Sequence, residues 1–262
     1  MIFRKVIISN KNKLLEYRES IFNLFKDCFQ QDIDEKLWAW AYIDNPNGSP
    51  VVSLYFDGEK LIGHYAVIPM NVVADGQEIK AALSMTTMVD LSYRKYGVFI
   101  SQAEDVYQKA IELGYKLVYG FPNKKSAPGF RKRLRWILEE DLYVAKLNKK
   151  DLLILKKEEQ GCIGFNFSNK DNFNWRMNKP SQQYIEHKNY ILKKFGAEFD
   201  VVFSDDDFND IDDNFEYNIL LSSDSGDYID KKQFDYTLGY RLFDDSLNTI
   251  GFKKDLIMSD VF

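Results

Sequence analysis

Apolar residues recur at helical spacing over residues 13–29, where they predict the first helix of the chain. Its apolar face consists of Leu14, Ile21, Phe25 and Cys28, widened by Phe22 and Phe29. A second, shorter helix is predicted from Asp34 to Tyr42. The tetrapeptide Asn45-Pro46-Asn47-Gly48 ends it, since these residue types are typical of turns.

Two hairpins are predicted next, each built around an Asp-Gly pair that favours a tight turn. The first joins Val51–Phe56 to Leu61–Val67, and the second joins Val72–Ala74 to Ile79–Val89. The last of these strands leads into a polar turn and then into the clearest helix of the chain. The apolar positions of that helix, at intervals of four and three residues, are Phe99, Ala103, Val106, Ala110 and Leu113.

Gly114 ends this helix, and a short buried strand, Leu117–Phe121, follows it. Pro122 and Asn123 close the strand. A short helix is predicted from Ser126 to Leu134, and a strand from Trp136 to Leu147. The order of elements up to this point predicts a mixed α/β fold with a mostly antiparallel, twisted sheet and flanking helices.

The turn between the strand Ile79–Val89 and the long helix has the composition of an anion site. The first N–H groups of a helix lack partners within the helix, and the helix dipole adds partial positive charge there. Gly97 lets a phosphate approach the backbone, and Arg94 and Lys95 add formal charge at the same edge. These residues predict a binding site for a diphosphate.

Gly161 and Gly164 bracket a break near residue 160, so we expect two parts, residues 1–158 and 159–262. The second part weakly repeats the first, with Trp175-Arg176 echoing Trp38-Ala39-Trp40. Its predicted elements are a hairpin of Tyr184–Glu186 with Tyr190–Lys193, a strand Tyr217–Ser222, and a helix from about Lys231. An acidic run, residues 205–213, takes the place of the basic turn. Two related halves are therefore predicted, with chance similarity as the alternative.

Composition limits the functions that are open to the chain. Its 262 residues are 45% hydrophobic and 29% charged, which is typical of a globular protein, and the net charge of −5 does not favour nucleic-acid binding. Two cysteines and two histidines argue against a metal site and for a reducing compartment. Without a signal-peptide pattern or a run of about 20 apolar residues, we expect a cytoplasmic protein that does not enter membranes.

The element order, together with two motifs, resembles the GNAT superfamily of acyl-CoA-dependent N-acyltransferases. The first motif is the Arg-x-x-Gly turn of Arg94 and Gly97, and the second is Gly120-Phe121-Pro122-Asn123 on the next strand. One branch of the family also has an early Trp and a degenerate second half with a Trp-Arg pair. The resemblance implies a GNAT fold with two GNAT-like halves and a site for acetyl-CoA in the first half.

The resemblance also implies roles for particular residues. The turn would hold the CoA diphosphate, and Met88 and Val89 would pair with the pantetheine arm as an added strand does. The turn residues are Arg94, Lys95, Tyr96, Gly97, Val98 and Phe99, the last standing where the family usually has Gly or Ala. Asn123 would lie where the thioester enters, with Ser126 and Phe130 along the arm. The basic run 124–135 would meet the 3′-phosphate or, alternatively, form a solvated helix face.

Catalysis is less clearly marked in the sequence. Many members of the family use a Tyr as the acid, but the matching stretch, Arg131–Trp136, contains none. Asp90 is a candidate base, with a turn cap as the alternative, and Tyr119 is a second candidate by strand alternation. For His64, packing is the favoured interpretation.

The function expected from the sequence is the transfer of an acyl group, acetyl above all, from acyl-CoA to a primary amine of a small molecule such as an amino sugar. One alternative is a module of the same fold that binds acyl-CoA without catalysis. Another is an aminoacyl-tRNA-dependent peptidyl transferase, which would require a basic surface facing RNA. We expect a monomer or homodimer without metal, nucleic-acid or membrane partners.

Overall fold

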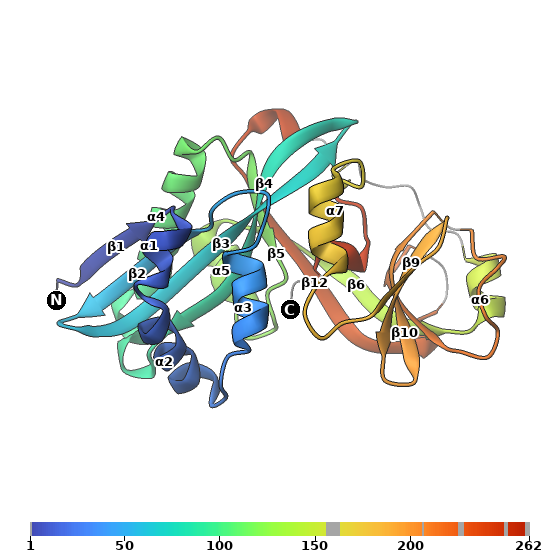
Figure 1. Cartoon of the computed structure of the whole chain (residues 1–262), viewed down its shortest axis with the longest axis horizontal. Coiled ribbons are helices and arrows are strands. Elements are labelled where there is room, and N and C mark those ends of the chain that lie inside the picture. The colour runs from blue at the N-terminus through green and yellow to red at the C-terminus, as the bar shows by residue number, and fades with distance from the viewer. Residues whose placement is uncertain (1, 156–162, 206, 225–227, 249–250, 260–262) are drawn as a thin grey trace.

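One long twisted sheet runs through the molecule, and helices cover parts of both its faces (Figure 1). The computed structural model describes residues 2–155, 163–205, 207–224, 228–248 and 251–259. The strands are β1 (Arg4–Ile8), β2 (Val51–Asp57), β3 (Lys60–Ala74), β4 (Gln77–Val89), β5 (Leu117–Gly120), β6 (Ile137–Leu147), β7 (Gly164–Phe165), β8 (Tyr184–Glu186), β9 (Tyr190–Phe195), β10 (Glu198–Ser204), β11 (Tyr217–Ser222) and β12 (Lys232–Leu242). The fold is mixed α/β with a mostly antiparallel sheet, as the sequence predicts.

The helices lie between these strands, and most of them are in the first part of the chain. The α-helices are α1 (Lys11–Leu15), α2 (Arg18–Phe29), α3 (Glu35–Tyr42), α4 (Val98–Glu112), α5 (Ala127–Leu134), α6 (Lys149–Ile154) and α7 (Lys170–Met177). Short 3₁₀ helices are η1 (Leu91–Tyr96), η2 (Ile229–Lys231), η3 (Asp245–Leu247) and η4 (Leu256–Met258). Among the described residues, no helix is long and apolar enough to cross a membrane.

The strand order is pseudo-symmetric about the central pair β12 and β6. It reads β1-β2-β3-β4-β5-β12-β6-β11-β10-β9-β8, with β7 pairing with β3 beside this path. Outward from the centre, β5, β4, β3 and β2 on one side correspond to β11, β10, β9 and β8 on the other. Strands β4 and β5 are parallel, as are β10 and β11. This order supports the predicted division into two related halves at residues 158 and 159, which stays a prediction.

The central strands join the two parts into one sheet. Strand β6 pairs with β11, and β12 lies between β5 and β6, so the last strand of each part completes the sheet of the other. Cutting the chain near residue 158 would therefore expose two sheet edges, which are prone to aggregation. The sheet organisation makes the two parts one folding unit.

Many elements lie where the hydrophobic pattern predicts them, but several differ. The strands predicted separately at Leu61–Val67 and Val72–Ala74 form the single strand β3, and β10 was not predicted. The first predicted helix is interrupted at Tyr17, which separates α1 from α2. The helix predicted from about Lys231 is wrong, since only the single turn η2 precedes strand β12. From Phe234 to Leu242 large apolar and other residues alternate strictly, which is the strand period and was overlooked. Strand β1 was not predicted, and Gly161 lies outside the described residues.

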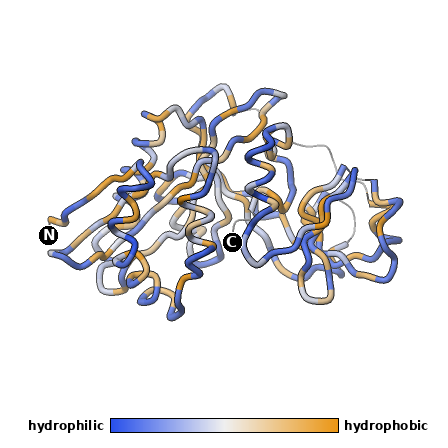
Figure 2. Tube along the Cα trace, viewed as in Figure 1, coloured by the Kyte–Doolittle hydropathy of each residue, from blue (hydrophilic) through white to orange (hydrophobic). Residues whose placement is uncertain are grey.

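The two faces of the sheet carry separate cores. On one face Leu83 and Tyr119 pack with residues of α1–α3 and α7, which Figure 1 shows in front of the sheet. On the other face Ala82 and Val118 pack with α4 and α5. Figure 2 shows hydrophobic segments along the central strands and hydrophilic stretches on peripheral helices and loops. We call the face that packs with α1–α3 and α7 the α2 face, and the face that packs with α4 and α5 the α4 face.

A pair of tryptophans joins the two parts on the α2 face. The rings of Trp40 in α3 and Trp175 in α7 stack with centroids 4.4 Å apart. Trp40 Nε1 donates to the carbonyl of Trp175 at 2.8 Å, and Trp175 Nε1 donates to the carbonyl of Trp40 at 2.9 Å. Both carbonyls lie in the last turn of a helix, where no helical partner is available. Each indole therefore satisfies the C-terminal end of the other helix.

We predict that Trp175→Phe lowers the free energy of unfolding by about 2–3 kcal/mol, because it leaves the buried carbonyl of Trp40 without its donor and reduces the stacked area. Urea unfolding measures this loss. The matched control is Trp38→Phe, which changes a similarly buried indole that stacks on Tyr42 and leaves the pair between the parts intact. Equal losses in the two variants would contradict the prediction.

Candidate active site

The parallel strands β4 and β5 separate after a short paired segment. They pair from Ala81 and Leu117 to Leu83 and Tyr119, after which β5 ends while β4 continues to Val89. A cavity of about 360 Å³ lies at this separation. It is lined by Ser84, Met85, Thr86 and Thr87 of β4 and by Gly120, Phe121, Pro122 and Asn123 at the end of β5. We call this cavity the cleft.

The cleft connects the two faces of the sheet. Phe25 and Phe29 of α2 line it from one face. Phe130 of α5 and Trp136 line it from the other face, where α4 packs. A long flexible ligand could therefore enter on the α4 face and present its end on the α2 face.

A β-bulge interrupts β4 inside the cleft. The pairing of β3 with β4 shifts register so that Thr86 and Thr87 together lie opposite Tyr65. Thr86 has a φ of 48°, in the left-handed region that a β-branched residue rarely adopts. Bulges of this kind interrupt the hydrogen-bond ladder and redirect backbone groups, and they are frequent next to active sites. Both threonines line the cleft.

His64 holds the bulge from the α2 face. Its Nδ1 lies 2.7 Å from the carbonyl oxygen of Thr86, and its side chain is buried. Burial lowers the pKa of His64 to about 4, so the ring is neutral near pH 7. Because a carbonyl oxygen can only accept, Nδ1 carries the proton and donates it. The ring therefore fixes the direction of the Thr86 peptide group.

Gln102 of α4 holds the same segment from the other face. Its Nε2 donates to the carbonyl of His64 at 3.3 Å and to the carbonyl of Met88 at 3.4 Å. Gly63 gives the helix room, because a Cβ at this position would lie 2.6 Å from both Gln102 Oε1 and Val98 Cγ1. The bulge is thus positioned by side chains on both faces of the sheet.

The buried histidine predicts a stability change with pH. Its pKa is about 4 in the folded chain and about 6.5 when unfolded, so between these values only the unfolded chain gains the proton. Stability should fall as the pH falls, by about 2 kcal/mol from pH 6.5 to 5.0 for this group. Urea unfolding of the wild type and of His64→Asn at both pH values measures it. An equal pH slope in the two proteins would refute the assignment.

The turn after β4 ends in a left-handed glycine at the start of α4. Gly97 has a φ of 74°, and no atom of the described residues lies within 4 Å of the position that its Cβ would take. The helix that it begins has 15 residues. Arg94 donates from Nε to the carbonyl of Val89, and Lys95 is exposed beside it. The turn thus places the first N–H groups of α4 beside two cations, and Gly97 has no side chain that would cover them.

Phe99 connects this turn with the cleft. Its ring packs edge-on against Phe130, with centroids 5.4 Å apart. Phe130 lines the cleft and in turn contacts Trp136. The turn before α4 and the α4 side of the cleft are therefore connected by packed aromatic rings.

Comparison with known proteins agrees with this geometry. The family model described as "Acetyltransferase (GNAT) domain" matches residues 15–137, which contain the cleft, the bulge and the turn. Residues 15–137 of this chain therefore form a GNAT domain. GNAT proteins of this kind use acyl-CoA and an acceptor substrate, so the family supports acyl transfer as the general activity. A search of curated proteins finds no match to the chain.

Solved structures with the same fold cover nearly the whole chain. A probable N-acyltransferase from Enterococcus faecalis V583 has a TM-score of 0.64 at 12% identity, over 92% of this chain and 73% of that one. A GCN5-related N-acetyltransferase from Anabaena variabilis ATCC 29413 has a TM-score of 0.59 at 12% identity, over 91% of this chain and 73% of that one. A protein from Pyrococcus horikoshii named "A Putative Acetyltransferase" has a TM-score of 0.55 at 12% identity, over 98% of this chain and 94% of that one. At these identities the likeness concerns the fold.

Of the five residues outside the turn that the GNAT resemblance assigns to the donor, three line the cleft and two do not. Asn123, Ser126 and Phe130 are in its wall. Met88 and Val89 lie further along β4, where their carbonyls accept from Gln102 and Arg94. Residues 84–87 occupy the wall in their place. The two consecutive threonines break the alternation of this strand. They are the sequence signal for a bulge at this place in the cleft wall.

The two predicted catalytic residues of this GNAT chain make structural contacts. Asp90 accepts from the backbone N–H of Ser92 at 2.8 Å and from Lys60 Nζ at 2.7 Å, and the lysine above all holds the pKa of the carboxyl below its usual value. Tyr119 is fully buried, donates to the carbonyl of Met258 at 3.4 Å, and has a pKa raised by burial. Neither lines the cleft.

We predict that Asp90→Asn changes turnover less than threefold. The amide keeps an oxygen for the Ser92 N–H and loses only the pairing with Lys60, whose side chain is exposed, so stability should fall by less than ~1 kcal/mol. Acetyl-CoA turnover and thermal unfolding measure the two effects. A loss of activity of 100-fold or more in a folded variant would instead identify Asp90 as the base.

Proposed function

We propose that this GNAT protein is an N-acyltransferase that moves an acyl group, with acetyl as the leading candidate, from acyl-CoA to a primary amine of a small molecule. The observation that carries the proposal is the cleft, which passes through the sheet at the β4–β5 separation and whose wall residue Phe130 packs against Phe99, next to the cationic turn before α4. A diphosphate group suits the turn, and an extended arm suits the cleft.

The donor would lie across both structures. Its diphosphate would accept hydrogen bonds from the N–H groups at the start of α4, beside Gly97, with Arg94 and Lys95 adding charge. The arm would pass between β4 and β5. Asn123 uses its side-chain oxygen to cap the next turn, through the N–H groups of Lys125 and Ser126. Its amide nitrogen makes no hydrogen bond within the described residues and is available to the arm.

The chemistry would take place beside the bulge. The nitrogen of a neutral amine attacks the thioester carbon, and a tetrahedral intermediate with a negative oxygen forms before the C–S bond breaks. A backbone N–H of the Thr86–Thr87 bulge would stabilise that oxygen, with His64 as the positioning residue that holds the peptide group. The thiolate then takes up a proton, and the amine loses one to water. Orientation supplies much of the remaining rate.

A second candidate is a module that binds acyl-CoA without catalysis. The structural contacts of Asp90 and Tyr119 favour it, because both side chains that the sequence nominated for proton transfer are engaged elsewhere. In this alternative the cleft would still accept the donor, and only turnover would be lost.

Calorimetry and a thiol-release assay separate these possibilities. We expect acetyl-CoA and CoA to bind at micromolar concentration, and a panel of primary amines to release free CoA faster than buffer alone. Binding without amine-dependent release would favour the module. The absence of binding at millimolar acetyl-CoA would refute both functions.

A further inference from the structure

A second cavity lies in the C-terminal part and adjoins the cleft. It has a volume of about 730 Å³, and Phe121, which lines the cleft, also lines this cavity. The ring of Tyr236 on β12, another lining residue, lies 5.4 Å from that of Phe121. Both rings pack with the core of the α2 face. The second cavity therefore begins where an acyl group that has passed through the cleft would emerge.

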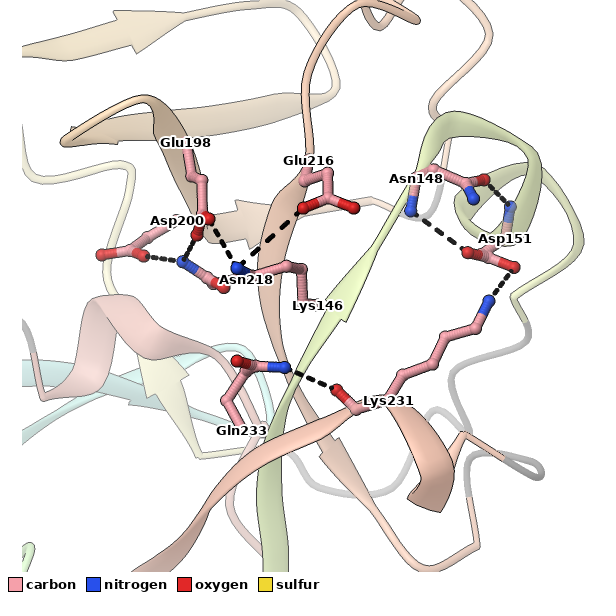
Figure 3. A network of polar contacts seen from close by, with 9 residues as sticks. All are labelled: Lys146, Asn148, Asp151, Glu198, Asp200, Glu216, Asn218, Lys231 and Gln233. Carbon is pink, nitrogen blue, oxygen red and sulfur yellow. Dashed lines mark hydrogen bonds and ion pairs between the residues drawn. The ribbon is translucent and has the colours of Figure 1, made fainter.

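The floor of this cavity is a connected polar network on β6, β10 and β11 (Figure 3). Lys146 pairs with Glu198 at 2.5 Å. Asn218 donates through Nδ2 to Asp200 at 3.1 Å and to Glu198 at 3.3 Å. Lys193 pairs with Asp200 at 3.1 Å. Figure 3 shows Glu198, Asp200 and Asn218 grouped beside Lys146.

The charged residues that line this floor are two lysines and two carboxylates, which limits the kind of ligand that suits it. Glu216, which lies 3.9 Å from Lys146, is outside the lining. A cationic ligand would meet Lys146 and Lys193, and an anionic one would meet Glu198 and Asp200. Hydroxyl groups fit both, because each can donate to a carboxylate and accept from an ammonium or amide group. The hydroxyl-rich part of a ligand adds hydrogen bonds here without introducing an unpaired charge, and an amine on the same ligand would lie toward the cleft, away from Lys146 and Lys193.

Two exposed aromatic rings stand at the walls of the same cavity. The side chains of Phe195 and Phe234 are 63% and 53% exposed, although both line the cavity. Rings exposed to this extent offer apolar area that a ligand can cover. The flat C–H faces of a sugar ring suit such surfaces, while the hydroxyls at its edge would reach the polar floor.

We propose that this cavity binds the acceptor, and that the acceptor carries its amine on a polyhydroxylated ring, as an amino sugar does. The inference rests on the proposed acyl transfer for the role of the ligand and on the cavity itself for its chemistry. The C-terminal part would thus select the acceptor, while the first part holds the donor.

Ligand-observed saturation-transfer NMR tests this with three amino sugars (glucosamine, galactosamine and mannosamine) and with cyclohexylamine, an amine on a six-membered ring without hydroxyls. We expect saturation transfer to at least one sugar and at least fivefold less to cyclohexylamine. Phe195→Ala and Phe234→Ala should each weaken the sugar signal at least threefold. Phe215→Ala, which removes another exposed ring of the C-terminal part outside this cavity, should leave it unchanged.

The outcomes separate the inference from the function on which it rests, because acetyl-CoA calorimetry is run on the same samples. Acetyl-CoA binding without transfer to any sugar overturns the acceptor inference and leaves the donor site in place. Equal signals from cyclohexylamine, or equal effects of the three Phe variants, also overturn it. Sugar binding without acetyl-CoA binding would keep the cavity as a sugar site and refute the acyltransferase.

Discussion

Replacing Gly97 with tryptophan is expected to weaken acetyl-CoA binding by at least ~100-fold, about 3 kcal/mol. The indole would occupy the open space in front of the helix N–H groups, where the diphosphate must approach the backbone. The left-handed φ of 74° adds a strain of roughly 1–2 kcal/mol, which is small enough for the chain to remain folded. Calorimetry with acetyl-CoA measures the affinity, and thermal unfolding measures the strain.

The same helix offers a matched control at its other end. Gly114 has a φ of 82°, and no atom of the described residues lies within 4 Å of its Cβ position either. Gly114→Trp therefore carries a similar strain and the same side chain, but away from the turn. We expect it to lower stability as Gly97→Trp does and to leave acetyl-CoA affinity within threefold of the wild type. If the two variants bind acetyl-CoA equally well, the turn is not the diphosphate site.

His64→Leu is expected to lower kcat by ~100-fold and to leave the KM for acetyl-CoA nearly unchanged. Without the ring N–H, the carbonyl of Thr86 loses its donor on the α2 face, so the bulge loses the orientation that the transition state needs. Loss of one donor to a developing oxyanion has an effect of 10²–10³ in other enzymes. Donor binding depends on the turn before α4 and should persist. Steady-state kinetics with acetyl-CoA and a reactive amine measure both constants.

An asparagine at this position is the conservative partner of the leucine variant. The side-chain amide places a nitrogen donor close to where Nδ1 of His64 lies, so His64→Asn should recover kcat to within tenfold of the wild type. It also lacks a group that titrates near neutral pH, which separates positioning from acid–base catalysis. A kcat that is equally low in both variants would show that the imidazole does more than hold Thr86.

Local patterns along the chain account for most of the individual elements. The spacing of apolar residues predicted α4 nearly to its ends, and the predicted strand Tyr217–Ser222 coincides with β11. Such elements are decided by periodicity and by end signals within about ten residues. The helix predicted from about Lys231 was wrong because it followed the weak repeat of the first part, whereas the alternation from Phe234 onward indicates a strand.

The candidate site was predictable on one side only. The turn around Gly97 and the wall residue Asn123 follow from motifs that are local in the sequence. Phe25 and Phe29 enter the cleft from a helix about sixty residues away from β4, and their sequence pattern predicts only a core position. His64 of β3 and Gln102 of α4 position the bulge of β4 through contacts between these three packed elements. No pattern within any one of the elements predicts these contacts.

The sequence by itself determined most of the elements, their order and the glycine turn before α4 that we propose for the diphosphate, because helix period, turn residues and a glycine before a helix are properties of short segments. Only the tertiary structure decided what those elements do together. Strand pairing created the bulge at Thr86, the separation of β4 from β5, and the exchange of β6 and β12 between the two parts. Each depends on contacts between distant residues, where register and packing, rather than local preference, determine the geometry.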